Sequence, residues 1–120
     1  MNALFDTSIL IDYLLGHAPA RREFKRYRHR KVSIVSWMEV MVGANADNEA
    51  LTRAFLEQFE RVPVRPDVAE RAVALRREHR IKLPDAIVWA SAQLEDCLLV
   101  TRNSRDFKPG LPGIRVPYSR

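Results

Sequence analysis

Short apolar runs alternate with segments of helical periodicity along the whole chain. Short, mostly apolar runs occupy 3–5, 32–35, 98–100 and 114–116, with Ser33 and Arg115 as their only polar members. Runs this short and continuous are typical of strands buried on both faces of a parallel sheet. Between them, apolar residues recur at helical spacing in 9–15, 20–28, 37–44, 51–59, 68–75 and 87–94. This alternation predicts an α/β fold with a short, mostly parallel central sheet and helices on both faces.

Composition narrows the class of protein. The 120 residues are 47% hydrophobic and 29% charged, which is typical of one globular domain and excludes a disordered chain. No apolar stretch approaches the roughly 20 residues of a membrane-spanning helix, and no secretory signal is recognisable. The only cysteine, Cys97, cannot form an internal disulfide, so we expect a buried thiol and a cytoplasmic protein. The net charge of +5 favours a polyanionic partner.

Acidic residues follow the predicted strands. Asp6 comes directly after the first run, Glu39 follows the second, and Asp106 lies shortly after the third. Asp85 opens the strongly apolar helix that leads into the third run. The carboxyl ends of parallel strands lie at one edge of the sheet, and sites in such sheets form there. We therefore expect these carboxylates to converge.

Each acid also has a local explanation that the sequence leaves open. Asp6 is placed to cap the helix that follows it, and Ser36 with Glu39 forms a capping-box pattern. Asp85 suits the first turn of its helix, where a negative charge complements the helix dipole. Asn103 and Asp106 are residues typical of turns.

Convergence would have a chemical consequence. Crowded carboxylates repel one another and become protonated unless a cation neutralises them. Oxygen ligands without a cysteine or histidine cluster favour Mg²⁺ or Mn²⁺ over zinc. Such ions activate water and stabilise the leaving oxygen in phosphodiester cleavage. The pattern therefore predicts a metal-dependent enzyme acting on nucleic acid.

Four stretches together resemble a known family. "DTSILIDYL", "SWMEV", "LPDAIVWASA" and "LVTRNSRDF" occur in the order and near the spacings of PIN-domain ribonucleases, most closely the VapC-type toxins of VapBC toxin–antitoxin systems. The resemblance covers nearly the whole chain. It implies a single PIN domain over residues 1–120, with a three-layer α/β/α sandwich. It also implies an Mg²⁺- or Mn²⁺-dependent endoribonuclease acting on RNA such as tRNA, a homodimer, and a small VapB-like antitoxin as partner.

The resemblance carries roles to individual residues. Asp6, Glu39 and Asp85 match the first three acids of the family. The fourth position departs from the family pattern, because Asn103 stands where an acid is common and Asp106 is expected to supply the remaining carboxylate. We expect Asp6, Asp85 and Asp106 to hold the principal metal ion. The other roles are Glu39 for a second ion or the attacking water, Asn103 as an additional metal ligand, and Ser36 and Thr101 as hydroxyls that orient the ligands.

Attack by water would leave a 5′-phosphate and a 3′-hydroxyl on the RNA. The basic stretch "ARREFKRYRHRK" is either a solvated helix with two aromatic anchors or an RNA-binding track. The residues expected to bind RNA are Arg22, Lys25, Arg26 and Arg102. The missing acid at Asn103 keeps open a catalytically silent module that binds RNA or protein. A flavodoxin-like nucleotide domain is disfavoured because no phosphate-binding glycine motif is present.

Overall fold

The computed structural model describes residues 2–108 and 110–120, and within them it contains one five-stranded sheet. All four strand pairings are parallel, and the strand order is β3-β2-β1-β4-β5. The strands are β1 (Asn2–Phe5), β2 (His29–Ser33), β3 (Glu60–Val62), β4 (Leu98–Val100) and β5 (Ile114–Arg115). The predicted parallel sheet is confirmed.

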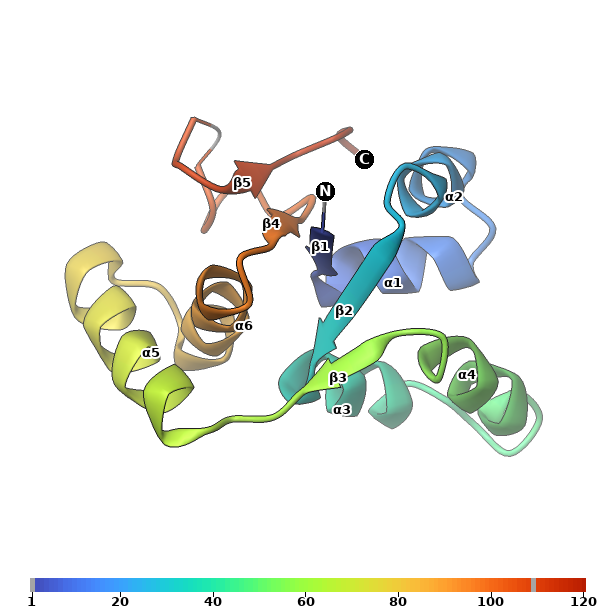
Figure 1. Cartoon of the computed structure of the whole chain (residues 1–120). Coiled ribbons are helices and arrows are strands. Elements are labelled where there is room, and N and C mark those ends of the chain that lie inside the picture. The colour runs from blue at the N-terminus through green and yellow to red at the C-terminus, as the bar shows by residue number, and fades with distance from the viewer. Residues whose placement is uncertain (1, 109) are drawn as a thin grey trace.

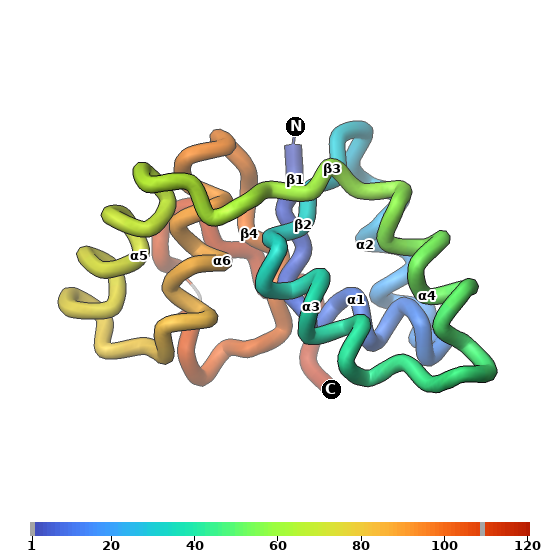
Figure 2. Tube along the Cα trace, turned by 90° about the horizontal axis from the view of Figure 1, so that it is seen from below, coloured from blue at the N-terminus to red at the C-terminus, as the bar shows by residue number. Residues whose placement is uncertain are grey.

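Helices cover both faces of this sheet. They are α1 (Thr7–Leu14), α2 (Ala18–Lys25), α3 (Ile34–Val42), α4 (Glu49–Leu56), α5 (Pro66–His79) and α6 (Leu83–Leu94). Figure 1 shows α5 and α6 on one side of the strands and α1, α2 and α4 on the other, with α3 at the end of β2. The same separation is visible from below in Figure 2. The predicted α/β/α sandwich is therefore confirmed.

The alternation of side chains along β1 divides the core in two. Leu4 packs into the cluster beneath α5 and α6, whereas Ala3 and Phe5 point to the opposite face. Around Phe5 the second cluster is largely aromatic and includes Phe24, Tyr27, Phe55 and Phe59. Strands flank β1 on both sides and helices cover both faces of the sheet, so Ala3, Leu4 and Phe5 are fully buried. The continuous apolar run "ALF" is thus explained by its central position.

Two predicted boundaries are wrong at the second strand. The strand was expected at 32–35, but β2 ends at Ser33 and α3 begins at Ile34. The Ser33 hydroxyl accepts a hydrogen bond from the Val35 amide at 3.1 Å and caps the helix. The capping-box interpretation of Ser36 is therefore wrong, and Glu39 lies in the second turn of α3 rather than the first.

The start of β2 and the whole of β3 were not predicted, because their residues are mostly polar. β2 begins at His29, inside the basic stretch, so α2 ends at Lys25 rather than continuing to residue 28. The edge strand β3 was not predicted, because its exposed Glu60 and Arg61 leave only Val62 facing the core. The thiol of Cys97 is buried as expected, and burial raises its pKa to about 11. No helix in the described parts of the chain is long and apolar enough to cross a membrane.

Candidate metal centre

Asp6 lies at the point where the order of the strands reverses. From β1 the chain moves to β2 and β3 on one side of the sheet, whereas β4 and β5 lie on the other. Open α/β sheets form their binding crevice at this switch point, beyond the carboxyl ends of the strands. Asp6 is only 6% exposed, and its amide donates to the Val100 carbonyl at the end of β4 at 2.9 Å.

The Asp6 carboxylate is oriented by two hydroxyl groups, one in the first turn of α1 and one just after β4. It occupies the N-cap position of α1 but makes no side-chain capping hydrogen bond. Thr101 Oγ1 donates to Asp6 Oδ2 at 2.8 Å, and Ser8 Oγ donates to the same oxygen at 3.1 Å. Burial raises the pKa of Asp6, and these two hydrogen bonds oppose the shift. The carboxylate is fixed in position, with its second oxygen turned from these donors.

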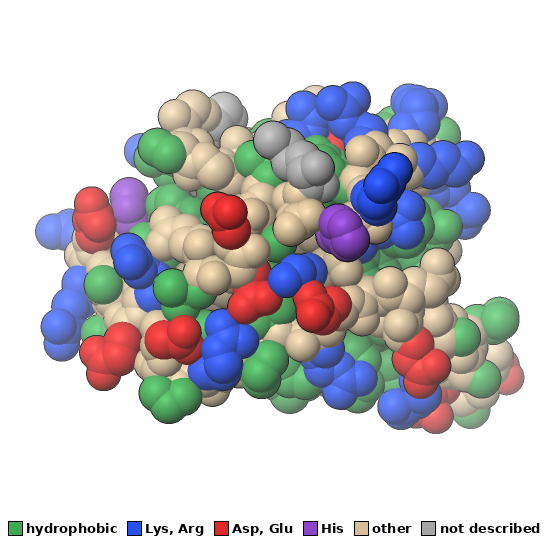
Figure 3. Space-filling model, viewed as in Figure 1, with side chains coloured by type: hydrophobic (Ala, Val, Ile, Leu, Met, Phe, Trp, Pro, Cys, Tyr) green, Lys and Arg blue, Asp and Glu red, His purple; other side chains and the backbone are tan. Residues whose placement is uncertain are grey.

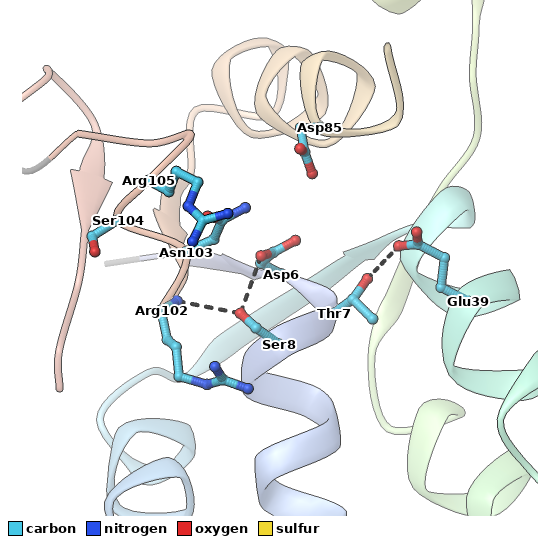
Figure 4. Close-up of a pocket in the computed structure, with 9 residues that line it drawn as sticks. All are labelled: Asp6, Thr7, Ser8, Glu39, Asp85, Arg102, Asn103, Ser104 and Arg105. Carbon is cyan, nitrogen blue, oxygen red and sulfur yellow. Dashed lines mark hydrogen bonds between the residues drawn. The ribbon is translucent and has the colours of Figure 1, made fainter. Parts of the chain in front are cut away.

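Glu39 approaches the same cavity from α3. Its Oε1 accepts a 2.6 Å hydrogen bond from Thr7 Oγ1 in the first turn of α1. Figure 4 shows this contact bridging the two helices beside Asp6. Thr7 and Ser8 therefore orient two of the four predicted acids. Sequence reasoning missed both residues, although two hydroxyls directly after an acid at a strand end were a usable signal.

Asp85 carries the strongest electrostatic signal of the site. It lies half-buried in the first turn of α6, as predicted, and its carboxylate faces the cavity in Figure 4. Burial, followed by the negative charges of Asp6, Asp106 and Glu39, raises the pKa of Asp85 to about 6. The four acids are thus close enough for their charges to interact, as the strand arrangement predicts.

Asn103 and Asp106 form a closed turn after β4. Asn103 Nδ2 donates to Asp106 Oδ2 at 2.9 Å, and the Asp106 amide donates to Asn103 Oδ1 at 3.3 Å. The Asn103 amide group therefore holds the Asp106 carboxylate, and its carbonyl oxygen is already engaged. Asn103 lines the acidic cavity and Asp106 lines a neighbouring one. In this arrangement Asn103 positions Asp106, and a role as metal ligand stays a prediction.

The donor set fits a hard divalent cation in its chemistry. Four carboxylates with no adjacent cysteine or histidine are the ligands that Mg²⁺ and Mn²⁺ favour. The pKa of Asp85 is raised first by burial and then by the charges of the neighbouring acids, and a cation would relieve the repulsion among these charges. In the described part of the chain, however, no three acidic, histidine or cysteine side chains already form a metal-binding cluster. The carboxylates surround an open space and would have to turn toward an ion.

The acidic cavity is open and has a volume of about 560 Å³. Residues from α1, α3, α6 and the segment after β4 line it, as Figure 4 shows: Asp6, Thr7, Ser8, Glu39, Asp85, Arg102, Asn103, Ser104 and Arg105. Of the residues expected to bind RNA, only Arg102 is among them. Arg22, Lys25 and Arg26 line a different cavity beside α2, and no residue lines both.

Two residues with predicted roles, Ser36 and Arg102, have different surroundings from those that the prediction requires. The Ser36 side chain is fully buried, and its hydroxyl has no hydrogen-bond partner among the described residues. It therefore orients none of the four acids in this conformation. The Arg102 guanidinium is bound to Asp12, through Nε at 2.7 Å and Nη2 at 3.3 Å.

Asp12 forms hydrogen bonds with both the segment after β4 and the C-terminal residues. This carboxylate on α1 is 1% exposed and accepts hydrogen bonds from Tyr118 Oη at 2.8 Å and Arg120 Nη1 at 2.9 Å, besides those from Arg102. Although burial would raise it, the pKa of Asp12 is lowered by the hydrogen bonds and charges of these partners. The Arg102 amide in turn donates to Ser8 Oγ at 3.2 Å, so the network reaches Asp6.

Comparison with known proteins agrees with this geometry. The family model for the PIN domain matches residues 3–108. A structure described as a toxin–antitoxin complex from Klebsiella pneumoniae contains a similar chain, with 46% sequence identity, a TM-score of 0.93 and coverage of 98% of this chain and 99% of that one. No curated protein matched.

More distant structures share the fold. The DNA-bound VapBC structure from Salmonella typhimurium matches with 21% identity and a TM-score of 0.79, over 96% of each chain. The VapBC2 structure from Rickettsia felis, bound to a promoter DNA fragment, matches with 19% identity and a TM-score of 0.76, over 95% of this chain and 96% of that one. With the PIN model spanning nearly the whole sequence, and four acids gathered at the switch point of a parallel sheet, this chain belongs to the PIN domain family.

Proposed function

We propose that this protein is a metal-dependent endoribonuclease and the toxin of a toxin–antitoxin pair. The observation that carries the proposal is the group of four acids around Asp85, whose mutual repulsion and burial raise the pKa of Asp85 to about 6. Strongly perturbed acids in an open cleft are typical of functional sites. Membership of the PIN domain family supports a nuclease.

Each acid has a proposed role. Asp6, Asp85 and Asp106 hold a Mg²⁺ or Mn²⁺ ion, and Glu39 holds a second ion or the attacking water. When bound, the ion supplies activation of water and stabilisation of the departing 3′-oxygen. Thr101 and Ser8 keep Asp6 oriented, Thr7 does the same for Glu39, and Asn103 for Asp106. Attack by water leaves a 5′-phosphate and a 3′-hydroxyl.

The toxin assignment rests on similarity. The 46% identity with a chain of the Klebsiella pneumoniae toxin–antitoxin complex extends over 98% of this sequence. We propose a small VapB-like antitoxin as protein partner, a homodimer as the assembly, and RNA such as tRNA as substrate. Co-expression with a VapB-like antitoxin that binds it should yield a complex that does not cut RNA.

Cleavage of end-labelled total tRNA tests the nuclease. We expect wild-type protein to cut with Mg²⁺ or Mn²⁺ and to stop with EDTA, whereas Asp85→Asn should cut at least 100-fold more slowly because a metal-binding carboxylate is lost. The matched control is Glu57→Gln, which neutralises an exposed acid outside the cavity.

Three results would contradict the proposal. Equal cutting by wild type and Asp85→Asn would identify a contaminating nuclease. A 2′,3′-cyclic phosphate product would exclude direct attack by water. RNA or antitoxin binding without any cutting would favour a silent binding module, the alternative that Asn103 keeps open.

A further inference from the structure

The acidic cavity continues into two smaller cavities on one side. Arg105 lines both the acidic cavity and a second cavity of about 250 Å³, which Arg80 and Lys108 also line. Arg80 in turn lines a third cavity of about 330 Å³ together with Arg76 and Arg77. Because neighbouring cavities share a lining residue, their basic side chains follow one another along the surface, and this surface is here called the α5 groove: Arg76, Arg77, His79, Arg80, Arg105 and Lys108.

The fold brings two distant segments together to make this groove. The last turn of α5 and Arg80 supply one wall, and the segment 105–108 after β4 supplies the other. Arg80 has a left-handed backbone (φ 56°), which ends α5 and turns the chain toward α6. In Figure 2 the end of α5 and the segment after β4 lie next to each other at the lower left.

Positive charge in the groove is largely uncompensated. Arg77, Arg80, Arg105 and Lys108 are exposed, and none has an acidic partner within ion-pair distance among the described residues. The opposing charges are Asp106, which Asn103 binds, and Glu78, which lies 3.7 Å from the His79 ring, together with Asp85 beyond Arg105. Arg76 donates to the Ile81 carbonyl at 2.5 Å.

A local role explains only part of this cluster. Basic residues in the last turn of a helix complement its dipole, which accounts for Arg76, Arg77 and His79 on α5. It does not account for Arg105 and Lys108, which come from a different segment. Both line the second cavity, and Arg105 also lines the acidic cavity.

We propose that the α5 groove binds the sugar–phosphate backbone of single-stranded RNA on one side of the cleaved bond. This inference rests on the proposed nuclease function and adds the path of the substrate. Arginine forks bind phosphate oxygens, and a cationic groove that follows the backbone is typical of single-strand binding. Among the described residues no Phe, Tyr or Trp lines the cavities of the groove, so the groove binds by charge and not by base identity.

The groove replaces α2 as the principal RNA surface. Figure 3 shows Lys and Arg side chains gathered over α2 at the upper right and others along α5 on the left. Arg22, Lys25 and Arg26 line a cavity of about 530 Å³ that shares no residue with the acidic cavity or the α5 groove. A strand bound at the acids and continuing through Arg105 therefore runs toward α5.

Binding measurements under EDTA separate the groove from catalysis. The probe is a fluorescein-labelled 12-nucleotide single-stranded RNA, followed by anisotropy from 50 to 200 mM salt. The test variant is Arg77→Gln with Lys108→Gln, and the matched control is Arg53→Gln with Arg61→Gln, which removes two exposed charges on α4 and β3, away from the acidic cavity, the α5 groove and the basic stretch before β2. We expect about tenfold weaker binding and a salt slope smaller by about 1.4 for the groove variant, since each lost phosphate contact removes about 0.7. The control should bind within twofold of wild type.

Several results would overturn the groove. If the test and control variants bind RNA equally weakly, the loss is a general effect of net charge and not of the groove. If only Arg22→Gln with Lys25→Gln loses RNA affinity, the RNA binds at α2. If RNA binding is unchanged but poly-glutamate binding is lost, the groove is a site for an acidic protein segment. Lys108→Gln alone, outside any helix or strand, repeats the test if the double variant fails to fold.

The groove and the nuclease fail independently. Wild-type protein that binds the probe through the groove but never cuts RNA would leave the groove intact and remove the nuclease. If wild-type protein cuts RNA but the groove variant binds the probe with the same salt slope as wild type, the nuclease stands and the groove is ruled out.

Discussion

At the scale of single residues, Asp85 links the proposed chemistry to stability. Its pKa is raised to about 6, first by burial and then by the neighbouring acids. Between pH 4 and 6 the folded protein therefore binds more protons at this site than the unfolded chain, whose aspartates have a pKa near 3.9. The free energy of unfolding consequently loses this contribution as the pH rises through that range. At neutral pH the protein therefore carries a destabilising charge at Asp85, which the proposed metal ion would neutralise.

The Asp85→Asn variant should for this reason be more stable than wild type at pH 7.5. We expect a gain of about 2 kcal/mol, allowing for solvent screening of a half-buried group, and the gain should vanish below pH 4, where wild-type Asp85 is also neutral. Urea unfolding at pH 3.5, 5 and 7.5, without divalent ions, measures this. Equal stability at every pH would mean that the four acids are not crowded.

A pair of serines one helical turn apart tests the corrected start of α3. Ser33→Ala removes the hydroxyl that caps α3 and should cost about 1 kcal/mol in the free energy of unfolding. Ser36→Ala removes a buried hydroxyl without a partner among the described residues, and should leave stability unchanged or raise it. Urea unfolding of both variants decides the point. The opposite ranking would restore Ser36 as the cap.

At the scale of elements, the Asp12 network joins α1, the segment after β4 and the C-terminal residues. Asp12→Asn should cost about 2 kcal/mol at pH 7, because Arg102 and Arg120 lose their common counter-charge in a buried setting. The lowered pKa of Asp12 means that this stabilisation is present above pH 4 and is lost as the pH falls below it. The cost of the variant should therefore shrink toward pH 3.

Arg120→Ala is the control for that network. Its side chain is 41% exposed, so its loss should change the free energy of unfolding by less than about 1 kcal/mol. If Arg120→Ala costs as much as Asp12→Asn, the C-terminal residues hold the network together and not the Arg102 pair. Urea unfolding of the two variants at pH 7 and pH 3 distinguishes these cases.

The elements also show what the sequence could predict. Buried strands and apolar helices can be predicted from the sequence, because burial requires apolar residues at regular positions along the element. The clear cases are β1 and α6. The end of a helix that is fixed by a single hydrogen bond leaves no such pattern. For this reason the cap of α3 was assigned to Ser36 instead of Ser33. Strands whose residues are mostly polar, such as β3, carry no apolar pattern. The same holds for the candidate site: the acids were visible as carboxylates after strands, whereas the groove arises only when α5 and residues 105–108 fold together.

At the scale of the whole molecule, the proposed metal ion would be bound by side chains from several separate elements of the fold. Its proposed ligands come from the end of β1, from α3 at the end of β2, from α6 on one face of the sheet, and from the segment after β4. An ion bound by these carboxylates stabilises only the folded chain, by an amount set by its concentration relative to the dissociation constant. Unfolding by heat therefore reports metal binding without any RNA present.

We expect Mn²⁺ at ten times its dissociation constant to raise the free energy of unfolding by about 1.4 kcal/mol at pH 7.5, and EDTA to reverse the effect. The shift should be absent in Asp85→Asn and unchanged in Glu57→Gln. It should also weaken at pH 5, because Asp85 with a pKa near 6 is then mostly protonated and must lose its proton before it binds a cation. Thermal unfolding of the three proteins at both pH values makes the comparison. An equal Mn²⁺ effect in wild type and Asp85→Asn would place the ion elsewhere and leave the four acids without their proposed ligand.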